Sequence, residues 1–398
     1  MKITSVDIIA PRMGQPVSGA YPVLCRVNTD AGIYGYGEAT LSIGVAARPV
    51  FETIKSLAGL IFGMDPFEHE VIWEKLRHLS YWALSGGVIH MAAMSAIDIA
   101  LWDIRGKACN LPVYKLLGGK QREKLRSYAS QVHFGWGIDP SAPDCPKTGS
   151  PEWFFQSCKN AAADGYDAVK IGLLMHSADG GRLSFQETTG CLSQSTLNMA
   201  EARLAAAREA LGPNADIILE NHALTDGVSS IQLLNMAEKY GIFFVEEATA
   251  PLNPQVMRRI ADKTNIPLAT GERTYSRWGF LPFLENGSLT VLQPDVGTCG
   301  GITEFKKICD MAHTYDVSIQ GHQYITGISY AATLHLEAAI PNFTIHEHHI
   351  TTEFPANIAL CTNNYRPVNG YIEIPDLPGL GQELTEETLR TADIETVK

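Results

Sequence analysis

An acid and a histidine stand two positions apart at the end of the apolar run in IILENHALTD, where they are Glu220 and His222. If the run is a β-strand, alternate side chains share a face, so the carboxylate and the imidazole point the same way. The pair is then either a metal ligand beside an acid/base group or a polar strand end without a chemical role. Short motifs recur by chance, so other residues must decide between the two.

Two more acids end apolar runs farther along the chain. Glu246 stands in FFVEEATAP and Glu272 in PLATGERTY, so the acids follow Glu220 at equal intervals of 26 residues (246 − 220 and 272 − 246). Each interval fits one strand and one helix, so we expect the three carboxylates to converge from adjacent strands. Like charges that close raise one another's pKa unless a cation neutralises them. Oxygen ligands with open positions favour Mg2+ over zinc. Exposed acids paired with lysines are the alternative.

Later apolar runs also end in polar residues. Asp295 ends LQPD, His322 ends IQGH, and Glu347 lies in IHEH. On neighbouring strands, Asp295 and His322 can form a carboxylate–imidazole pair that fixes the tautomer and raises the basicity of the ring. Alone, His322 would more often be a structural histidine. As a member of this series it is predicted to be catalytic.

These residues need a scaffold that brings strand ends together. Eight short apolar runs lie within residues 121–355, namely LRSYAS, YDAVKIG, ADIILEN, IFFVEEA, IPLATGE, LTVLQPD, VSIQGH and FTIHEH. Segments with helical periodicity separate them; in ITEFKKICDMAHTY, for example, apolar residues recur at threes. Alternating β/α units of this number predict an α/β fold with a (β/α)8-type barrel, whose catalytic groups lie at the C-terminal ends of the strands.

The flanking segments predict a second unit. Within residues 1–120, three β-rich runs precede helices expected near 46–62, 68–80 and 88–108, which together indicate an N-terminal α+β capping domain. Residues 356–398 contain PVNGYIEIPDLPGLG and are expected to pack back on the capping domain and complete it.

Composition excludes several classes of function. The formal net charge of -12 over 398 residues argues against a nucleic-acid-binding surface. No apolar run approaches the ~18 residues of a membrane span, and the N-terminal stretch lacks the apolar core of a signal peptide. The eight cysteines are scattered without a CxxC pair, which favours reduced thiols and a cytoplasmic location over disulfides or a zinc cluster. A homo-oligomer is the default for a soluble enzyme of this size.

In this order, the motifs resemble the enolase superfamily, mandelate racemase group. The resemblance covers essentially the whole chain and rests on the LWDIRGK helix, the strand-end carboxylates and the Asp–His pair. GERTYSRWGF, LQPDVGTCGGITE and ENHA are most similar to acid-sugar dehydratases of the galactonate and mannonate type. The resemblance implies Mg2+ as cofactor on Glu220, Glu246 and Glu272, an acid sugar as substrate, and an acid/base role for His222.

Two features depart from the family pattern. The first metal ligand is usually Asp, whereas Glu220 is one methylene longer. The racemase branch carries Lys-x-Lys at the end of the second strand, whereas this chain has Lys170-Ile171-Gly172 and lacks the second lysine. Two histidines without that lysine favour elimination over racemisation.

The resulting prediction is a hydro-lyase that removes water from an aldonate or aldarate and yields a 2-keto-3-deoxy acid. His322, oriented by Asp295, would remove the α-proton, and His222 would protonate the departing 3-hydroxyl. Glu347 and Lys170 would hydrogen-bond the substrate carboxylate. An acid-sugar epimerase of the same superfamily is one alternative, and a non-catalytic barrel that binds a sugar acid is another.

Substrate specificity is expected from loops around the mouth of the barrel. These are the capping-domain loops near 12–21 and 81–87 and the two long connections that follow the first and second barrel strands. The candidate substrate-binding residues are Trp82, Trp136, Tyr324 and Arg12, although each aromatic ring could equally serve packing.

Overall fold

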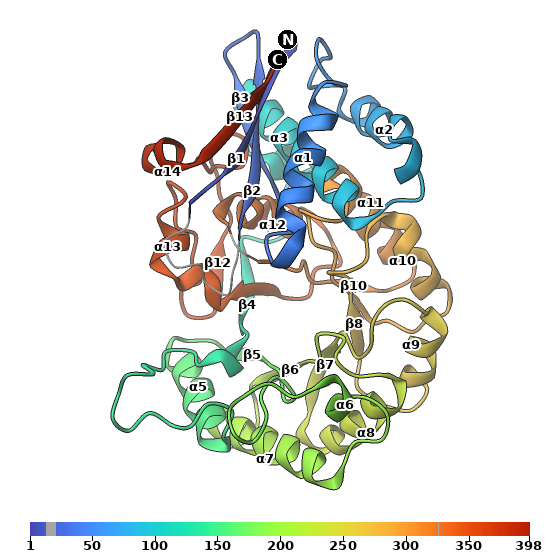
Figure 1. Ribbon diagram of the computed structural model, residues 1–398, viewed down its shortest axis with the longest axis vertical. Helices are drawn as coiled ribbons and strands as arrows, with labels where there is room; N and C mark the ends of the chain where they lie inside the picture. Colours follow the sequence, from blue (N-terminus) through green and yellow to red (C-terminus); the bar gives the residue numbers. More distant parts are fainter. Residues whose placement is uncertain (13–20, 325) are drawn as a thin grey trace.

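The computed structural model describes residues 1–12, 21–324 and 326–398 (Figure 1). Within them the chain forms a four-stranded antiparallel sheet and a larger, curled sheet built from parallel strands. Residues 13–20, which make up most of the first expected capping-domain loop, lie outside the described residues.

The parallel strands coincide with the eight expected apolar runs. They are β4 (Lys124–Ser130), β5 (Ala168–Ile171), β6 (Asp216–Glu220), β7 (Ile242–Glu246), β8 (Leu268–Thr270), β9 (Val291–Leu292), β10 (Ser318–Ile319) and β11 (His346–His349). Their order is β10-β9-β8-β7-β6-β5-β4-β11. Beyond β10, the Ile319 N–H donates to Asn342 O at 2.8 Å, just before β11 begins. This arrangement is an α/β architecture of the barrel type.

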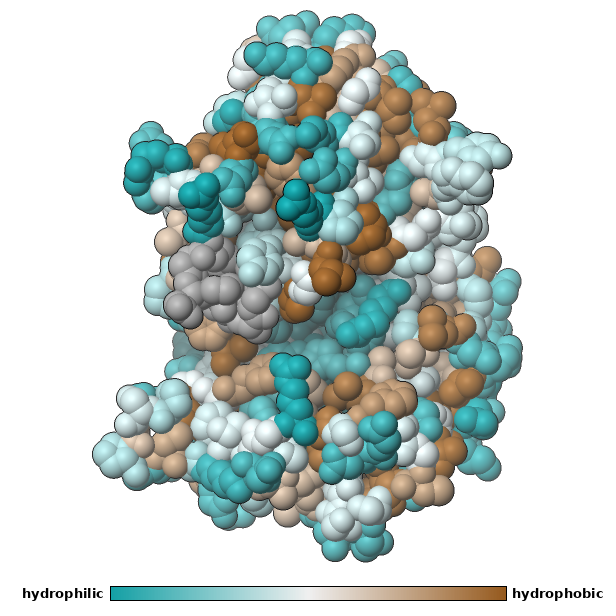
Figure 2. All heavy atoms as spheres, viewed as in Figure 1, coloured by the Kyte–Doolittle hydropathy of each residue, from teal (hydrophilic) through white to brown (hydrophobic). Residues whose placement is uncertain are grey.

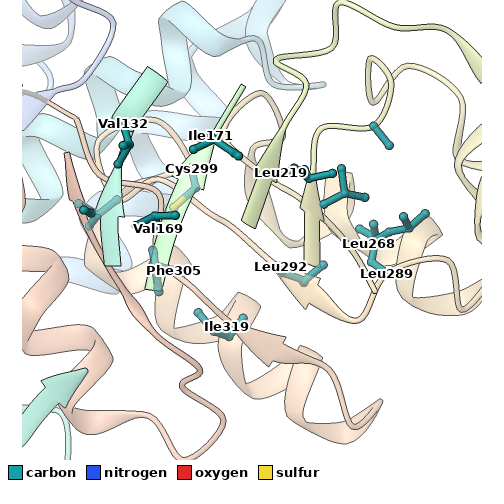
Figure 3. Close-up of a cluster of buried hydrophobic side chains, with 14 of the residues drawn as sticks. Val132, Val169, Ile171, Leu219, Leu268, Leu289, Leu292, Cys299, Phe305 and Ile319 are labelled. Atoms are coloured by element: carbon teal, nitrogen blue, oxygen red, sulfur yellow. The ribbon is translucent and has the colours of Figure 1, made fainter. Parts of the chain in front are cut away.

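Helices separate the successive strands. They are α5 (Pro151–Ala163), α6 (Phe185–Thr188), α7 (Gln194–Leu211), α8 (Gly227–Ala237), α9 (Pro254–Ala261), α10 (Ser276–Glu285), α11 (Gly301–Thr314) and α12 (Gly327–Ala339). Asp226 caps the start of α8, because its carboxylate accepts from the N–H groups of Val228 and Ser229. The helices bury their apolar faces against the sheet; Figure 3 shows Phe305 of α11 in one cluster with Ile171 and Leu219. In the described residues, no helix has the length and apolar character to cross a membrane.

Residues of the expected capping domain and of the C-terminal segment form the antiparallel sheet. Its strands are β1 (Ile3–Ala10), β2 (Val23–Thr29), β3 (Tyr34–Ala39) and β13 (Asp393–Val397), in the order β13-β1-β2-β3. The three helices expected in the capping domain are α1 (Ala47–Ala58), α2 (His69–Leu79) and α3 (Val88–Cys109), close to the expected ranges. Pairing of β13 with β1 places the two chain ends side by side in Figure 1. The other α-helices and strands of the described residues are α4 (Val113–Leu116), α13 (Pro355–Ile358), β12 (Tyr371–Glu373) and α14 (Glu386–Thr391).

Buried carboxylates join the capping domain to the barrel helices. Asp98 of α3 accepts from Thr303 N at 2.9 Å and Thr303 Oγ1 at 2.6 Å. Glu38 of β3 accepts from Thr326 Oγ1 at 2.5 Å and Ser329 N at 3.0 Å. Burial raises the pKa of both carboxyls to about 7, although these hydrogen bonds oppose the change. The interface therefore depends on a few buried polar contacts as well as on apolar packing.

Candidate active site

The strand-end acids face the interior of the curled sheet. Side chains alternate along a strand, so Ile218 and Glu220 share one face of β6, and Phe244 and Glu246 share one face of β7. Ile218 and Phe244 belong to a small apolar cluster contributed by the strands, apart from the larger cluster that contains Leu219 (Figure 3). Glu220 and Glu246 lie directly opposite each other in register. A polar layer therefore follows the apolar one at the carboxyl ends of the strands.

Lys170 lies at the centre of this polar layer. Its Nζ is 2.8 Å from both Glu246 Oε1 and Glu347 Oε1, and 3.0 Å from Glu220 Oε2. The lysine side chain is fully buried. Burial lowers the pKa of Lys170, but the surrounding carboxylates outweigh this and hold the pKa well above its ordinary value. A cation thus stands among three acids, with a hydrogen bond to Glu246 and ion pairs to Glu220 and Glu347.

A group that could hold a metal ion lies beside Lys170. The ligand atoms of Glu220, His222 and Glu272 all lie within 4.8 Å of one another. Glu220 Oε2 is buried, and its ion pair with the lysine lacks the geometry of a hydrogen bond, so this oxygen remains an open acceptor. Glu246 stands outside the group because its Oε2 accepts from Gln293 Nε2 at 2.5 Å and its Oε1 faces the lysine. Carboxylate oxygens with one imidazole nitrogen fit a divalent cation.

The charges of these acids respond to their burial. Burial and the nearby Glu220 raise the pKa of Glu246 to about 7. Burial also raises the pKa of Glu220, against the effect of Lys170. For Glu347, burial opposes ionisation, yet Lys170 and His322 hold its pKa below the ordinary value. A cation bound beside Glu220 and Glu246 would oppose the effect of burial and favour the charged forms of these two carboxyls.

His322 and Asp295 form the expected pair. Nδ1 of the ring is 2.7 Å from Asp295 Oδ2, and Nε2 is 3.3 Å from Glu272 Oε2. The two residues follow β10 and β9 and are joined by a parallel bridge. Burial lowers the pKa of His322, but the charge of Glu272 and the hydrogen bond to Asp295 outweigh it and raise the pKa to about 10. The imidazole is therefore directed by one carboxylate toward another.

His222 occupies a tight turn after β6. Its φ is 46° and that of Ala223 is 53°, both in the left-handed region that non-glycine residues rarely adopt. The N–H of His222 donates to Glu220 Oε1 at 2.8 Å, which couples the turn to the acid. The Gln131 side-chain amide lies 3.3 Å from His222 Nε2 and can donate to it or, turned over, accept from it. Burial lowers the pKa of His222, although Glu272 opposes the change.

The candidate substrate-binding residues lie in different settings. Trp136 is 4% exposed, and its Nε1 donates to Asp164 Oδ2 at 2.8 Å, so its ring packs in the core rather than on an open wall. Tyr324 is buried with its ring against His349. Trp82 is 90% exposed, and Arg12 forms an exposed ion pair with Asp393.

The loop that carries Trp82 reaches the barrel. A Cβ atom on Gly86 would lie 2.9 Å from the ring of Tyr275, three residues after Glu272. On the face shown in Figure 2, a hollow with hydrophilic residues separates the capping domain from the barrel. The second capping-domain loop therefore lies close to the segment that supplies one of the site's acids.

Sequence reasoning missed several polar partners. Ser130 Oγ donates to Glu347 Oε1 at 2.5 Å, and Gln293 donates to Glu246 as described above. Both could have been found, because each follows the strand alternation that identified the acids. Thr40 donates from the capping domain to Asp295, 255 residues away, and no local pattern indicates it.

Comparisons with known proteins agree with this architecture. Residues 12–118 match the family described as mandelate racemase / muconate lactonizing enzyme, N-terminal domain, and residues 154–388 match the enolase C-terminal domain-like family. The D-galactonate dehydratase of Ralstonia pickettii (strain 12J) is 32% identical over 368 residues, which cover 91% of this chain and 88% of that protein. The D-galactonate dehydratase of Pectobacterium atrosepticum is 31% identical, with coverage of 91% and 88%.

Solved structures are similar over the full length. A member of the enolase superfamily from Salmonella Typhimurium is 51% identical, with a TM-score of 0.95 and coverage of 100% of both chains. The 3,6-anhydro-D-galactonate cycloisomerase from Zobellia galactanivorans is 26% identical, with a TM-score of 0.83 and coverage of 99% and 100%. The dehydratases among the relatives confirm the expected hydro-lyase class. With both parts of the chain matched, the protein belongs to the mandelate racemase / muconate lactonizing enzyme group of the enolase superfamily.

Proposed function

We propose that the protein is a Mg2+-dependent sugar-acid dehydratase that converts an aldonate or aldarate into a 2-keto-3-deoxy acid. The observation that carries this proposal is the placement of His222 and His322 at one acid cluster. His222 follows β6 and His322 follows β10, four strands apart in the sheet, yet each ring lies beside Glu272. An elimination must move two protons at neighbouring carbons, and two imidazoles on opposite sides of a substrate suit that task.

Glu220 and Glu272 would hold the metal ion, with Glu246 or His222 as a third ligand. The ion supplies positive charge beside the carboxylate of the substrate. The expected ligand set has Glu246 as its third member, whereas the alternative set has His222 in that place. Measuring the Mg2+ affinity of variants with one of these two residues replaced separates the two sets.

His322 takes the proton from the carbon next to the substrate carboxylate. Its Nδ1–H donates to Asp295, which leaves Nε2 as the reacting nitrogen. A neutral ring is needed, and positive charge at Glu272 would offset the carboxylate that raises the pKa of His322. His222 then gives a proton to the departing hydroxyl, so that water leaves and the resulting enol rearranges to the keto acid.

For Lys170 and Glu347 we propose charge balance in place of the expected hydrogen bonds to the substrate carboxylate. Both oxygens of Glu347 are in use, because Oε1 faces Lys170 and Ser130 while Oε2 accepts from Gln323 N at 3.0 Å. Lys170 is surrounded by protein carboxylates. We infer that the two residues balance charge beneath the substrate and do not bind its carboxylate.

The proposed function also implies a domain division, a cellular compartment and an assembly for the whole molecule. Residues 1–120 would form the capping domain, 121–355 the catalytic barrel, and 356–398 the segment that completes the capping domain. The loop with Trp82 would contact the sugar acid from above. All eight cysteines are free, in keeping with a reducing cytoplasm, and a homo-oligomer without nucleic-acid or membrane partners is the expected assembly.

A panel of aldonic and aldaric acids tests the function. The enzyme, supplied with Mg2+ in D2O, should convert at least one acid into a keto acid with loss of water, detected by mass spectrometry and semicarbazide. An epimerase is the second candidate, because opposed histidines can remove and return a proton on opposite faces. Its product would keep the elements of water and be heavier than the substrate only by the deuterium that replaces the α-hydrogen. Tight binding without any conversion would favour a non-catalytic sugar-acid-binding protein.

A further inference from the structure

The partner of the proposed base is held by a residue from the other domain. Thr40 directly follows β3 of the capping domain, and its Oγ1 donates to Asp295 Oδ1 at 2.5 Å. The same oxygen accepts from Gly297 N at 2.7 Å, while the other oxygen faces His322 Nδ1 at 2.7 Å. Both oxygens of this carboxylate therefore have fixed partners, and one of those partners comes from outside the barrel.

The contact with Thr40 is built into the local backbone. The Thr40 N–H donates to Gly297 O at 3.3 Å, so main chain and side chain both engage the segment after β9. A Cβ atom at Gly297 would lie 2.5 Å from Thr40 Cγ2 and 2.7 Å from its Oγ1. The glycine is required by this close approach of the threonine.

A second contact fixes the end of β3 two residues earlier. Glu38 accepts from Thr326 and Ser329 at the start of α12, as described above. The strand end is thus anchored to two separate parts of the barrel, one of which carries Asp295. Thr40 is placed by this anchoring and not by chance contact of an exposed loop.

We propose that Thr40 is a positioning residue for the His322–Asp295 pair, so that the proposed base is complete only when the capping domain is docked on the barrel. This inference rests on the proposed function of the pair. The hydroxyl fixes the rotation of the Asp295 carboxylate, which in turn sets the direction of the imidazole. The hydrogen bonds of Thr40 go to Asp295 and Gly297 and not to the proposed metal ligands, so loss of its hydroxyl should affect the chemical step and leave substrate binding nearly unchanged.

The test compares three variants of the full-length enzyme. Thr40→Val keeps the shape and removes the hydroxyl, Thr40→Ser keeps the hydroxyl, and Thr326→Val weakens the same domain interface without contacting Asp295. With Mg2+ and the acid turned over by the wild type, we expect kcat of Thr40→Val to fall roughly 10- to 100-fold, as small misplacements of catalytic groups do. Its KM should change less than about 2-fold, since the uniform binding of substrate is untouched. Thr40→Ser should restore most of kcat. Thr326→Val should lower thermal stability with little change in kcat, because the Ser329 N–H still donates to Glu38 and holds the end of β3 in place.

A second measurement does not depend on turnover. The Nδ1–H proton of His322, assigned through its absence in His322→Asn, should give a downfield NMR signal that shifts in Thr40→Val and is kept in Thr40→Ser and Thr326→Val. An unshifted signal in Thr40→Val, or equal losses of kcat in Thr40→Val and Thr326→Val, would overturn the inference. If the wild type turns over no acid at all, the proposed function fails, and the NMR comparison still decides the role of Thr40.

Discussion

Replacement of Lys170 by methionine tests the charge balance at the bottom of the site. The side chain keeps most of its volume but leaves Glu220, Glu246 and Glu347 without their shared cation. Glu347 depends on Lys170 most, since the lysine holds its pKa below the ordinary value. Forcing a carboxyl of ordinary pKa ~4.3 to take up a proton at pH 7 costs about 4 kcal/mol. Removing one partner of a buried ion pair costs about 3–5 kcal/mol, which agrees with this protonation cost.

The sign of the pH dependence follows from the same carboxyl. The depressed pKa of Glu347 stabilises the wild type at every pH above the unfolded pKa of ~4.3. In Lys170→Met the carboxyl must instead take up a proton on folding, and the cost of that uptake falls as the pH falls. The difference between wild type and Lys170→Met should therefore shrink from about 4 kcal/mol at pH 7 to about 1 kcal/mol at pH 5. Urea unfolding, followed by intrinsic fluorescence with EDTA present, measures both values.

Two controls accompany this variant. Adding Glu347→Gln should recover much of the lost stability, because it removes the charge that lacks a partner. Lys306→Met breaks an exposed pair with Asp310 and should change stability by less than about 0.5 kcal/mol. The reasoning would be refuted if the free energy of unfolding of Lys170→Met at pH 7 lay within about 1 kcal/mol of the wild-type value. It would also be refuted if the variant were equally destabilised at both pH values. A stable Lys170→Met with a raised KM and unchanged kcat would return Lys170 to the role of substrate ligand.

Three further outcomes are expected. Glu246→Gln should abolish metal-dependent turnover and weaken Mg2+ binding, measured by calorimetry, while the fold survives; an unchanged affinity would leave the third ligand position to His222. His222→Asn should stop dehydration but leave exchange of the α-hydrogen with D2O detectable by NMR, because His322 remains; loss of both together with weaker Mg2+ binding would make His222 a ligand. The pKa of Glu38 is raised from 4.5 to about 7, so its contribution to stability is complete below 4.5 and lost as the pH rises through 7. Relative to Glu38→Gln, the wild type should lose up to about 3 kcal/mol between pH 5 and pH 8 in urea unfolding, and parallel profiles would contradict this.

The strand-end acids could be predicted because two local rules specify them. Strand alternation places Glu220 on the same face as Ile218, and the regular length of a β/α unit places Glu246 directly opposite in the next strand. The same rules predicted the eight parallel strands and the neighbouring positions of Asp295 and His322. Each of these inferences needs only the residues of one or two successive units.

Other features depend on contacts between distant segments. An aromatic residue in a loop looks the same whether it packs or lines a cleft, so the sequence could not show that Trp136 donates to Asp164 in the core. The surroundings of Lys170 come from three other strands, and only their assembly reveals that protein carboxylates enclose it. Thr40 meets Asp295 because two domains dock, which no period in the sequence encodes.

The structure divides the polar residues of the site into two layers with different duties. Lys170, Glu220 and Glu246 lie within strands and have side chains that are at most 1% exposed. His222, Glu272 and His322 follow their strands by a few residues, and their side chains are 23%, 14% and 17% exposed. Rigid strands suit charges that must be balanced in the absence of water, whereas groups that exchange protons with substrate need access to it. Substitution of Lys170 should therefore act first on stability, and substitutions in the upper layer first on turnover.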